Sequence, residues 1–290
     1  MDRNADHVVD QVVDQHADEQ GEQADVLLLT GLSQELQWIQ RVSGLDFKRR
    51  MRNGTSYLCA DITRGERSVR IVTQRQLEPG LTIAAVTATK GICIWRPKFV
   101  VMTGLCAGIR GAVDLGDLIV ATQCFEHSSG QLINGLLVPA QSRVSIDPWL
   151  LDTLQSLTDS SSIIPDIQAS YTAALPADIK TRIHYGSMAC GPHVVKDESY
   201  MDALKNREYS LLGLDMESYG VALAASMCST HSHPVVPLII KGACDFADSE
   251  KCDHWHDYCS YASASFVLRL LEKVIMRDHA FSIIKGLAEH

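Results

Sequence analysis

The chain has 290 residues, of which 46% are hydrophobic and 21% charged, so it can form one large α/β domain or two small domains. Its formal net charge of -9 disfavours a nucleic-acid groove or an anionic membrane surface as the main partner. The nine cysteines are scattered without a CxxC pair, which favours reduced thiols, and no apolar run approaches the length of a membrane span. We therefore expect a soluble, cytoplasmic protein.

Residues 1–24 are polar and acid-rich and cannot bury much surface, which predicts a disordered arm or a short helix that needs a partner. From residue 25 to residue 290, strand and helix patterns alternate without an internal repeat, which predicts one domain. The fold class that we expect is α/β, a three-layer sandwich with a central mixed, largely parallel sheet flanked by helices.

Hydrophobic patterns place the elements along the chain. Strands are expected at Val26 to Gly31, Tyr57 to Ile62, Ser68 to Gln74, Pro97 to Gly108, Asp117 to Gln123, Ile183 to Gly191, Leu211 to Leu214 and Val235 to Ile240. Helices are expected at Gln34 to Val42 (capped by Ser33), Leu81 to Ile94, Trp149 to Leu157, after Glu217 as far as Met227, and Tyr258 to Arg277. Thr158 to Ile164 is expected to be a loop.

Carboxylates follow three of the buried strands, and a glycine-rich turn ends a fourth. In chain order, the residues at these strand ends are Glu35, then Leu105, Cys106, Ala107 and Gly108, then Asp215, Met216 and Glu217, then Asp245. A lone acid such as Asp245 is more often a helix cap. If the strands are parallel, however, all four ends lie along one edge of the sheet, where α/β proteins bind ligands. Together these residues predict a site.

Other motifs are weaker. Gly104, Gly108 and Gly111 have neither dinucleotide-binding nor P-loop spacing, but small residues there let a ribose or a purine approach the backbone. No GxSxG nucleophile motif is present. The segment from Cys252 to Cys259, with His254 and His256, offers zinc ligands but matches no usual spacing, and helix capping and packing explain it as well. We expect no metal and no cofactor.

Five segments together resemble the purine nucleoside phosphorylase and nucleosidase superfamily. They are GLSQEL, VVMTGLCAGIRGAVDLGDLIVA, HYGSMACGPHVVKD, LGLDMESYGVALAA and KGACDFADSEKCDHWHDY. Within it the chain is most similar to methylthioadenosine/S-adenosylhomocysteine nucleosidases, including nucleosidase domains that act as immune effectors. The resemblance runs from Asp25 to the C-terminal helix and implies at least a homodimer.

The resemblance also implies residue roles. Asp245 would be the general acid that protonates purine N7, Glu35 the base that activates water, and Glu217, beside Met216, the group that holds the ribose hydroxyls. Val194 and Val195 fall where the family reads the adenine edge with backbone groups. Two-carboxyl chemistry of this kind suits a reaction that passes through an oxocarbenium-like state.

Two positions differ from the family pattern. Cys244 stands where the family usually has Ser before the acid, and Val194 where an aromatic commonly stacks on adenine; both bear on the substrate more than on the reaction type. Phe246 is the other neighbour of the acid. The arginines with which phosphorylases bind phosphate have no evident match, which favours water as the nucleophile.

The predicted function is hydrolysis of an adenine nucleoside or nucleotide to adenine and a ribose product. The alternatives are an ATP-depleting immune effector, a phosphate-dependent phosphorylase and a non-catalytic nucleotide sensor. Four basic residues lie beside the motifs and are either phosphate ligands or ordinary surface and salt-bridge residues: Arg110, Lys196, Lys241 and Lys251.

Overall fold

The structure is a computed structural model that describes residues 22–134, 136–139, 142–159, 162–173, 179–248 and 253–275. The strands are β1 (Val26–Thr30), β2 (Lys48–Arg52), β3 (Thr55–Arg64), β4 (Arg67–Arg75), β5 (Phe99–Gly108), β6 (Leu118–Glu126), β7 (Gly130–Ile133), β8 (Leu136–Pro139), β9 (Arg143–Ser145), β10 (Ile183–Cys190), β11 (Leu211–Asp215) and β12 (Val236–Asp245). The helices are α2 (Ser33–Ser43), α3 (Leu81–Trp95), α4 (Pro148–Asp159), α5 (Ile163–Ser170), α6 (Glu198–Arg207), α7 (Ser218–Cys228) and α8 (His256–Leu270), with a 3-10 turn at Asp253–Trp255 and a π turn at Leu271–Ile275.

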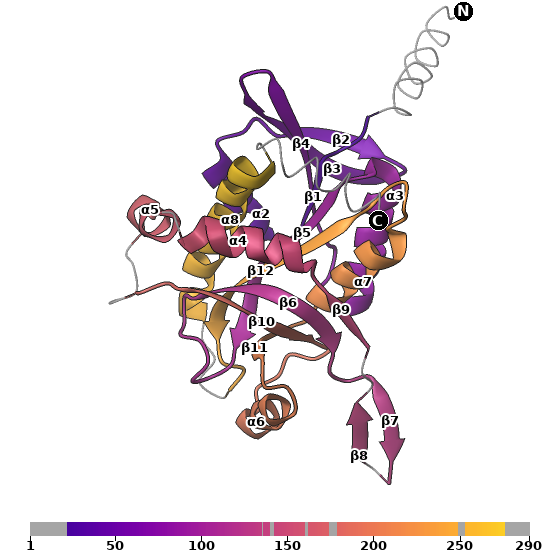
Figure 1. Ribbon diagram of the computed structural model, residues 1–290, viewed down its shortest axis with the longest axis vertical. Coiled ribbons are helices and arrows are strands. Elements are labelled where there is room, and N and C mark those ends of the chain that lie inside the picture. Colours follow the sequence, from indigo (N-terminus) through magenta and orange to yellow (C-terminus); the bar gives the residue numbers. More distant parts are fainter. Residues whose placement is uncertain are drawn as a thin grey trace, which may run out of the picture.

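The central sheet is buried on both faces. In β1, Val26 and Leu28 point into a core shared with α2, α4, α5 and α8, while Leu27 and Leu29 point into a second core shared with α3 and α7. Because successive side chains of a strand alternate between faces, an unbroken apolar run needs helices on both sides. The result is the expected three-layer α/β arrangement, in which α8 and α7 lie on opposite sides of β12 (Figure 1).

The sheet is mixed and partly closed on itself. The strand order is β11-β10-β6-β12-β5-β1-β4-β3-β2, and β11 pairs again with β5. Strands β1, β4, β5 and β12 are parallel to one another, whereas β6 is antiparallel to β12 and β11 is antiparallel to β5. The β11–β5 contact joins Gly213 to Gly108, and a Cβ on Gly213 would come within 3.1 Å of the Ala107 carbonyl oxygen. Glycine permits this close approach.

The strands and helices predicted from hydrophobic patterns are confirmed, most with ends shifted by a few residues. The C-terminal helix, expected from Tyr258 to Arg277, ends as an α-helix at Leu270 and continues as a π turn to Ile275; its expected end lies outside the described residues. Ser33 was expected to cap α2, but the Glu35 carboxylate instead accepts the backbone N–H groups of Gly31 and Leu32. The expected loop at 158–164 overlaps the end of α4 and the start of α5.

The elements that the sequence did not predict are short or exposed: β2, the β7–β8 hairpin, β9, α5 and α6. The exposed ones lack a strong apolar period, because much of their surface faces water.

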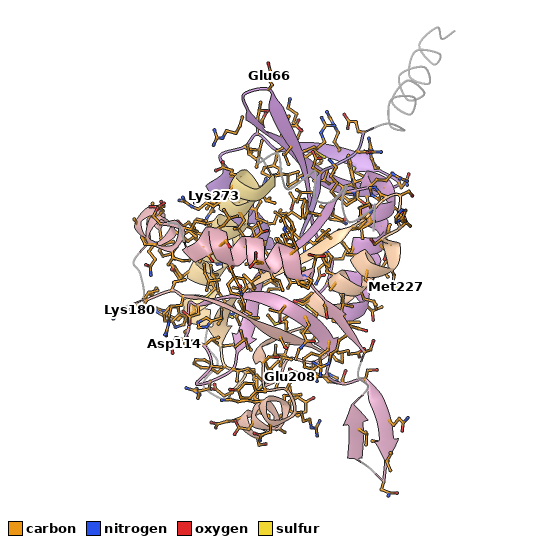
Figure 2. The ribbon with its side chains drawn as sticks, viewed as in Figure 1. Glu66, Asp114, Lys180, Glu208, Met227 and Lys273 are labelled. Atoms are coloured by element: carbon orange, nitrogen blue, oxygen red, sulfur yellow. The ribbon has the colours of Figure 1, made fainter. Side chains whose placement is uncertain are left out.

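Charged side chains such as Glu66, Asp114 and Lys180 lie at the edge of the molecule (Figure 2). No helix among the described residues is long and apolar enough to cross a membrane. The predicted N-terminal arm lies almost wholly in residues 1–21, outside the described ranges.

Candidate active site

A cavity of about 260 Å³ opens where β1, β5, β11 and β12 end. Its lining is mainly apolar, but polar side chains reach it from several elements: Glu35, His193, Asp215, Glu217, Asp245 and His256. Apolar walls with a few convergent polar groups are typical of small-molecule sites. The structure therefore brings together all four strand ends that the sequence singled out.

The four strands are not all parallel, as the expected shared edge required, since β11 is antiparallel to β5. The β11 end reaches the cavity nevertheless, because β11 pairs with β5 only at Gly108 and Ala107, the last residues of that strand. Asp215 therefore meets the end of β5 from the other direction. The partial closure of the sheet, rather than a common strand direction, places Asp215 and Glu217 in the site.

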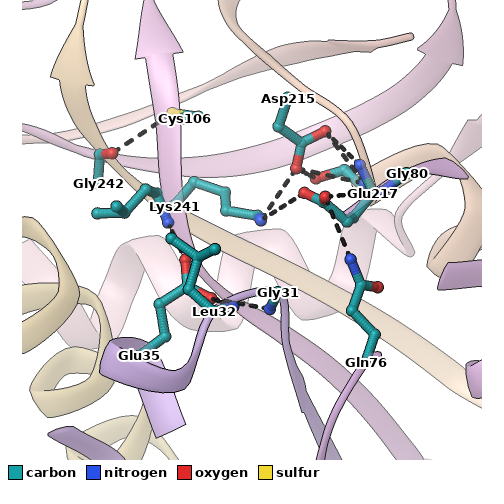
Figure 3. A network of polar contacts seen from close by, with 12 residues as sticks. Gly31, Leu32, Glu35, Gln76, Gly80, Cys106, Asp215, Glu217, Lys241 and Gly242 are labelled. Carbon is teal, nitrogen blue, oxygen red and sulfur yellow. Dashed lines mark hydrogen bonds and ion pairs between the residues drawn. The ribbon is translucent and has the colours of Figure 1, made fainter. Parts of the chain in front are cut away.

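Glu35 is held at the start of α2 by three backbone donors (Figure 3). Its Oε2 accepts hydrogen bonds from the N–H groups of Gly31 and Leu32, both at 2.8 Å, and its Oε1 accepts one from Leu105 N–H at 2.9 Å. The carboxylate occupies the space that a side chain at residue 104 would fill, because a Cβ on Gly104 would lie 2.1 Å from Oε1. Burial raises the pKa of Glu35 above its ordinary value, opposed by the charge of Lys241 and by the three N–H groups.

Lys241 joins two further carboxylates (Figure 3). Its Nζ lies 3.0 Å from Asp215 Oδ2 and 3.8 Å from Glu217 Oε2, and the side chain is only 1% exposed. Burial by itself lowers the pKa of Lys241, but the charges of Asp215, Glu217 and Glu35 outweigh burial and raise the pKa overall. Lys241 is therefore a buried salt-bridge residue, which is the alternative to the phosphate ligand considered from the sequence.

Glu217 is fixed from the opposite side by residues after β4. Its Oε1 accepts hydrogen bonds from Gln76 Nε2 and from Gly80 N–H, both at 3.2 Å. Burial raises the pKa of Glu217, Lys241 lowers it, and Asp215 contributes a further rise. Glu217 is thus a carboxylate whose two oxygens face different partners, which orients it within the cavity.

A β-bulge directs two consecutive side chains of β12 toward the same cavity. The register of β12 against β5 passes from Ala243 opposite Cys106 to Asp245 opposite Ala107, so Cys244 is the extra residue. Neighbouring residues of a regular strand face opposite sides, but a bulge re-aims them. Cys244 and Asp245 both line the cavity, and Cys244 Sγ donates to Asp245 Oδ2 at 3.4 Å. The Asp245 Oδ1 accepts Ala247 N–H at 2.8 Å.

Most of the other predicted binding residues line this cavity. They are Leu105, Cys106, Val194, Val195 and Met216. Val194 is 62% exposed, so a ligand would cover it from the open side.

Besides Lys241, which is buried outside the lining, three predicted binding residues do not line the cavity. Gly108 does not line the cavity, and a Cβ there would meet Val113 Cγ2 at 2.6 Å. Phe246 faces a neighbouring depression, where the Arg110 guanidinium lies 4.4 Å from the centre of its ring. Lys196 is exposed and outside the lining, and Lys251 lies outside the described residues.

Three residues at the site were not predicted as site residues from the sequence: Gln76, His193 and His256. Gln76 follows β4, which is parallel to β1, so the rule that selected the other strand ends would also have selected it. His256 was grouped with a helix-capping segment, but it lines the cavity close to Asp245. His193 gave no signal beyond its place in the HYGSMACGPHVVKD segment.

Comparisons with known proteins show which family and fold this chain shares. The chain is 29% identical over 263 residues to the protein y4jS of Sinorhizobium fredii, covering 88% of this chain and 63% of y4jS. It is 25% identical over 253 residues to the ATP nucleosidase Cap17 of Escherichia coli, covering 82% of this chain and 49% of Cap17. The chain thus spans less than two thirds of either relative.

The fold matches that of Helicobacter pylori 5'-methylthioadenosine/S-adenosylhomocysteine nucleosidase. The TM-score is 0.66 at 17% identity, over 88% of this chain and 100% of the other. The family model of the phosphorylase superfamily matches residues 25–275. The chain therefore belongs to the phosphorylase superfamily.

Proposed function

We propose that this chain is an N-glycosidase that hydrolyses an adenine nucleoside or nucleotide to adenine and a ribose product. One observation carries the proposal: a single, mainly apolar cavity is lined by Glu35, by Glu217 and by Asp245 on the bulged end of β12, and Lys241 lies beside Glu217. Membership of the phosphorylase superfamily and the names of the nucleosidase relatives support it.

The reaction assigns a different task to each carboxyl group. Asp245 donates a proton to N7 of the purine, so that adenine leaves as a neutral base when the C1'–N9 bond breaks. Glu35 accepts a proton from the water whose oxygen bonds to C1'. Glu217 holds the ribose hydroxyls, and its negative charge stabilises the oxocarbenium-like transition state. The raised pKa of Glu35 makes it a stronger base than an ordinary carboxylate at neutral pH.

Water is favoured over phosphate as the nucleophile by the charges of the site. No Lys or Arg is among the described residues that line the cavity. The ammonium group of Lys241 is buried outside the lining and already contacts Asp215 and Glu217. The acidic groups Glu35, Asp215 and Glu217 would repel a phosphate dianion brought close to C1'. A phosphorylase needs cations at this position, so the arrangement supports hydrolysis.

The identity of the 5' substituent separates two candidate substrates. An uncharged 5' group, as in methylthioadenosine, suits the apolar walls of the cavity. The similarity to an ATP nucleosidase favours a triphosphate. Arg110 contacts Asp248 and stacks on Phe246, so it would have to exchange partners to bind a phosphate, whereas Lys196 is exposed. The cytoplasmic location and the homo-oligomer of at least two chains belong to the same proposal.

The direct test is incubation of the purified protein with methylthioadenosine, S-adenosylhomocysteine, adenosine and ATP, each with and without phosphate. We expect free adenine without a phosphate requirement. Ribose 1-phosphate as a product would show a phosphorylase instead. Nucleotide binding without any base release would show a sensor.

Two variants test the assigned roles, Asp245→Asn and Glu35→Gln. Each is expected to lower kcat for adenine release by roughly 10²- to 10⁴-fold, the usual contribution of a general acid or base. Asp152→Asn, which changes an exposed carboxylate on α4, is the matched control and should leave kcat unchanged. Normal turnover by Asp245→Asn would remove this residue from the acid role.

A further inference from the structure

Three side chains of different chemistry gather at the end of β12, beside the proposed general acid. The Cys244 sulfur, an Asp245 carboxylate oxygen and a His256 ring nitrogen all lie within 4.8 Å of one another. Among the described residues, no other His, Cys, Asp or Glu side chains form a group of three this close. The candidate zinc segment of the sequence analysis, from Cys252 to Cys259, shares only His256 with this group, and the Cys259 thiol donates to the Ala243 carbonyl at 3.3 Å.

The local fold explains how this group arises. The bulge at Cys244 lets two consecutive side chains of β12 face the cavity together. His256 is the first residue of α8 and lines the same cavity, so its ring approaches Asp245 from the helix side. The three groups therefore come from two rigid elements rather than from a loop.

Thiolate, carboxylate and imidazole are the ligand types that zinc prefers. With a Zn–S bond of about 2.3 Å and a Zn–O bond of about 2.1 Å, sulfur and oxygen at adjacent corners of a tetrahedron lie roughly 3.6 Å apart. Cys244 Sγ and Asp245 Oδ2 lie 3.4 Å apart, so they need almost no movement. All three residues line the cavity, which leaves the fourth corner to a water or to a ligand nitrogen.

We propose that Cys244, Asp245 and His256 form a zinc-binding site that inhibits the enzyme reversibly. Binding replaces the protons of the Cys244 thiol and of the Asp245 carboxyl group by Zn²⁺, and both protons go to solvent. The Asp245 oxygen then coordinates the metal and has no proton to give to purine N7. The inhibitory part of this inference rests on the proposed function, whereas the binding part does not.

Cys244 is central to the inference, since it stands where the resembling family usually has Ser. Without metal its thiol donates to Asp245 and lies 3.4 Å from the Cys106 carbonyl oxygen, so it is a hydrogen-bonding group in the cavity wall. A serine hydroxyl could make the same hydrogen bonds but is a poor zinc ligand. Inhibition by zinc is therefore expected of this chain and of relatives that have a cysteine at the position of Cys244.

Cobalt is the probe of binding, because Co²⁺ takes tetrahedral zinc sites and reports its ligands by absorption. Full-length protein without added metal is titrated with CoCl₂ in a non-thiol reductant. We expect visible bands of tetrahedral Co²⁺ and a near-ultraviolet sulfur-to-cobalt band with one equivalent bound, both removed by excess ZnCl₂. The sulfur band should vanish in Cys244→Ser, and the affinity should fall by at least ~10-fold in His256→Gln.

Two variants of the same cavity serve as matched controls. Cys106→Ser removes another thiol of the lining, and His193→Gln removes another imidazole, but neither residue belongs to the cluster. Both should retain the cobalt spectrum. A sulfur-to-cobalt band that persists in Cys244→Ser, or no band in the unchanged protein, would overturn the proposed site.

Adenine release is then measured with increasing ZnCl₂, with MgCl₂ as the metal control and a chelator to reverse the effect. We expect zinc to stop turnover and magnesium to have no effect, because Mg²⁺ prefers oxygen ligands. Cobalt binding by a protein that releases adenine from no nucleoside would refute the proposed function and leave the metal site intact. Full activity with the metal site occupied would refute the inhibitory role.

Discussion

Replacing Lys241 with methionine tests the electrostatics of the site. Methionine has a similar length and no charge, so Lys241→Met keeps most of the packing and removes the ammonium group from between Asp215 and Glu217. All three residues are buried. The variant therefore leaves two buried carboxylates without their cation.

The expected loss of stability follows from the geometry. At the 3.0 Å that separates Lys241 Nζ from Asp215 Oδ2, two unit charges attract each other by about 5.5 kcal/mol at an effective dielectric constant of 20. Dehydration of the ammonium group offsets much of this attraction, but truncating one partner of a buried pair still costs about 3–5 kcal/mol. A domain is typically stable by about 5–15 kcal/mol, so we expect a folded but weakened protein.

The same change should move the pH dependence of activity. The charge of Lys241 lowers the pKa of both Glu35 and Glu217, which burial raises. Without that charge both pKa values rise further. In the proposed reaction Glu35 accepts a proton from water, which it can do only when ionised, so activity should be lost as pH falls through its pKa. We therefore expect the acidic limb of kcat/KM in the variant to lie at higher pH than in the unchanged protein.

Two measurements decide the outcome. Urea unfolding, monitored by tryptophan fluorescence, gives the change in free energy of unfolding. The rate of adenine release across the pH range gives the position of the acidic limb of kcat/KM. Lys241→Arg keeps the charge and should hold the limb close to its original pH. Equal unfolding free energies and an unmoved limb in Lys241→Met would refute the assignment of Lys241 as the buried counter-ion.

Two further changes probe the support of Glu35 and of its helix. Gly104→Ala places a Cβ where the Glu35 carboxylate lies, so kcat should fall by at least ~10²-fold. The control is Gly54→Ala, which is also at positive φ but in open space and should lower only the stability. Equal kcat values in the two variants would contradict this account. Asp257 accepts hydrogen bonds from Gln34, Trp38 and Tyr171 and so joins α8 to α2, and Asp257→Asn should lower the free energy of unfolding by about 1–3 kcal/mol in a urea titration. An unchanged urea midpoint would show that these bonds contribute little.

The sequence alone determined the layers of the fold and the chemical groups of the site. Apolar runs such as that of β12 have no polar face, so they indicate a sheet covered on both sides. The acids at the strand ends identified Glu35, Glu217 and Asp245 before any distance was known, because strand ends gather at one place in α/β proteins. Family resemblance added the roles that we propose for them.

The tertiary structure alone decided how these groups are arranged. Lys241 became a buried counter-ion because β11 turns back onto β5 and brings Asp215 to it, a pairing between residues that are far apart in the chain. Cys244 and Asp245 share one cavity because of a bulge, and His256 joins them from the start of α8. Hydrophobic periodicity reports which side of an element is buried, but it carries no information about strand direction, bulges or contacts between distant segments. Those features come from packing of the whole chain, and they determine which residues meet in the site.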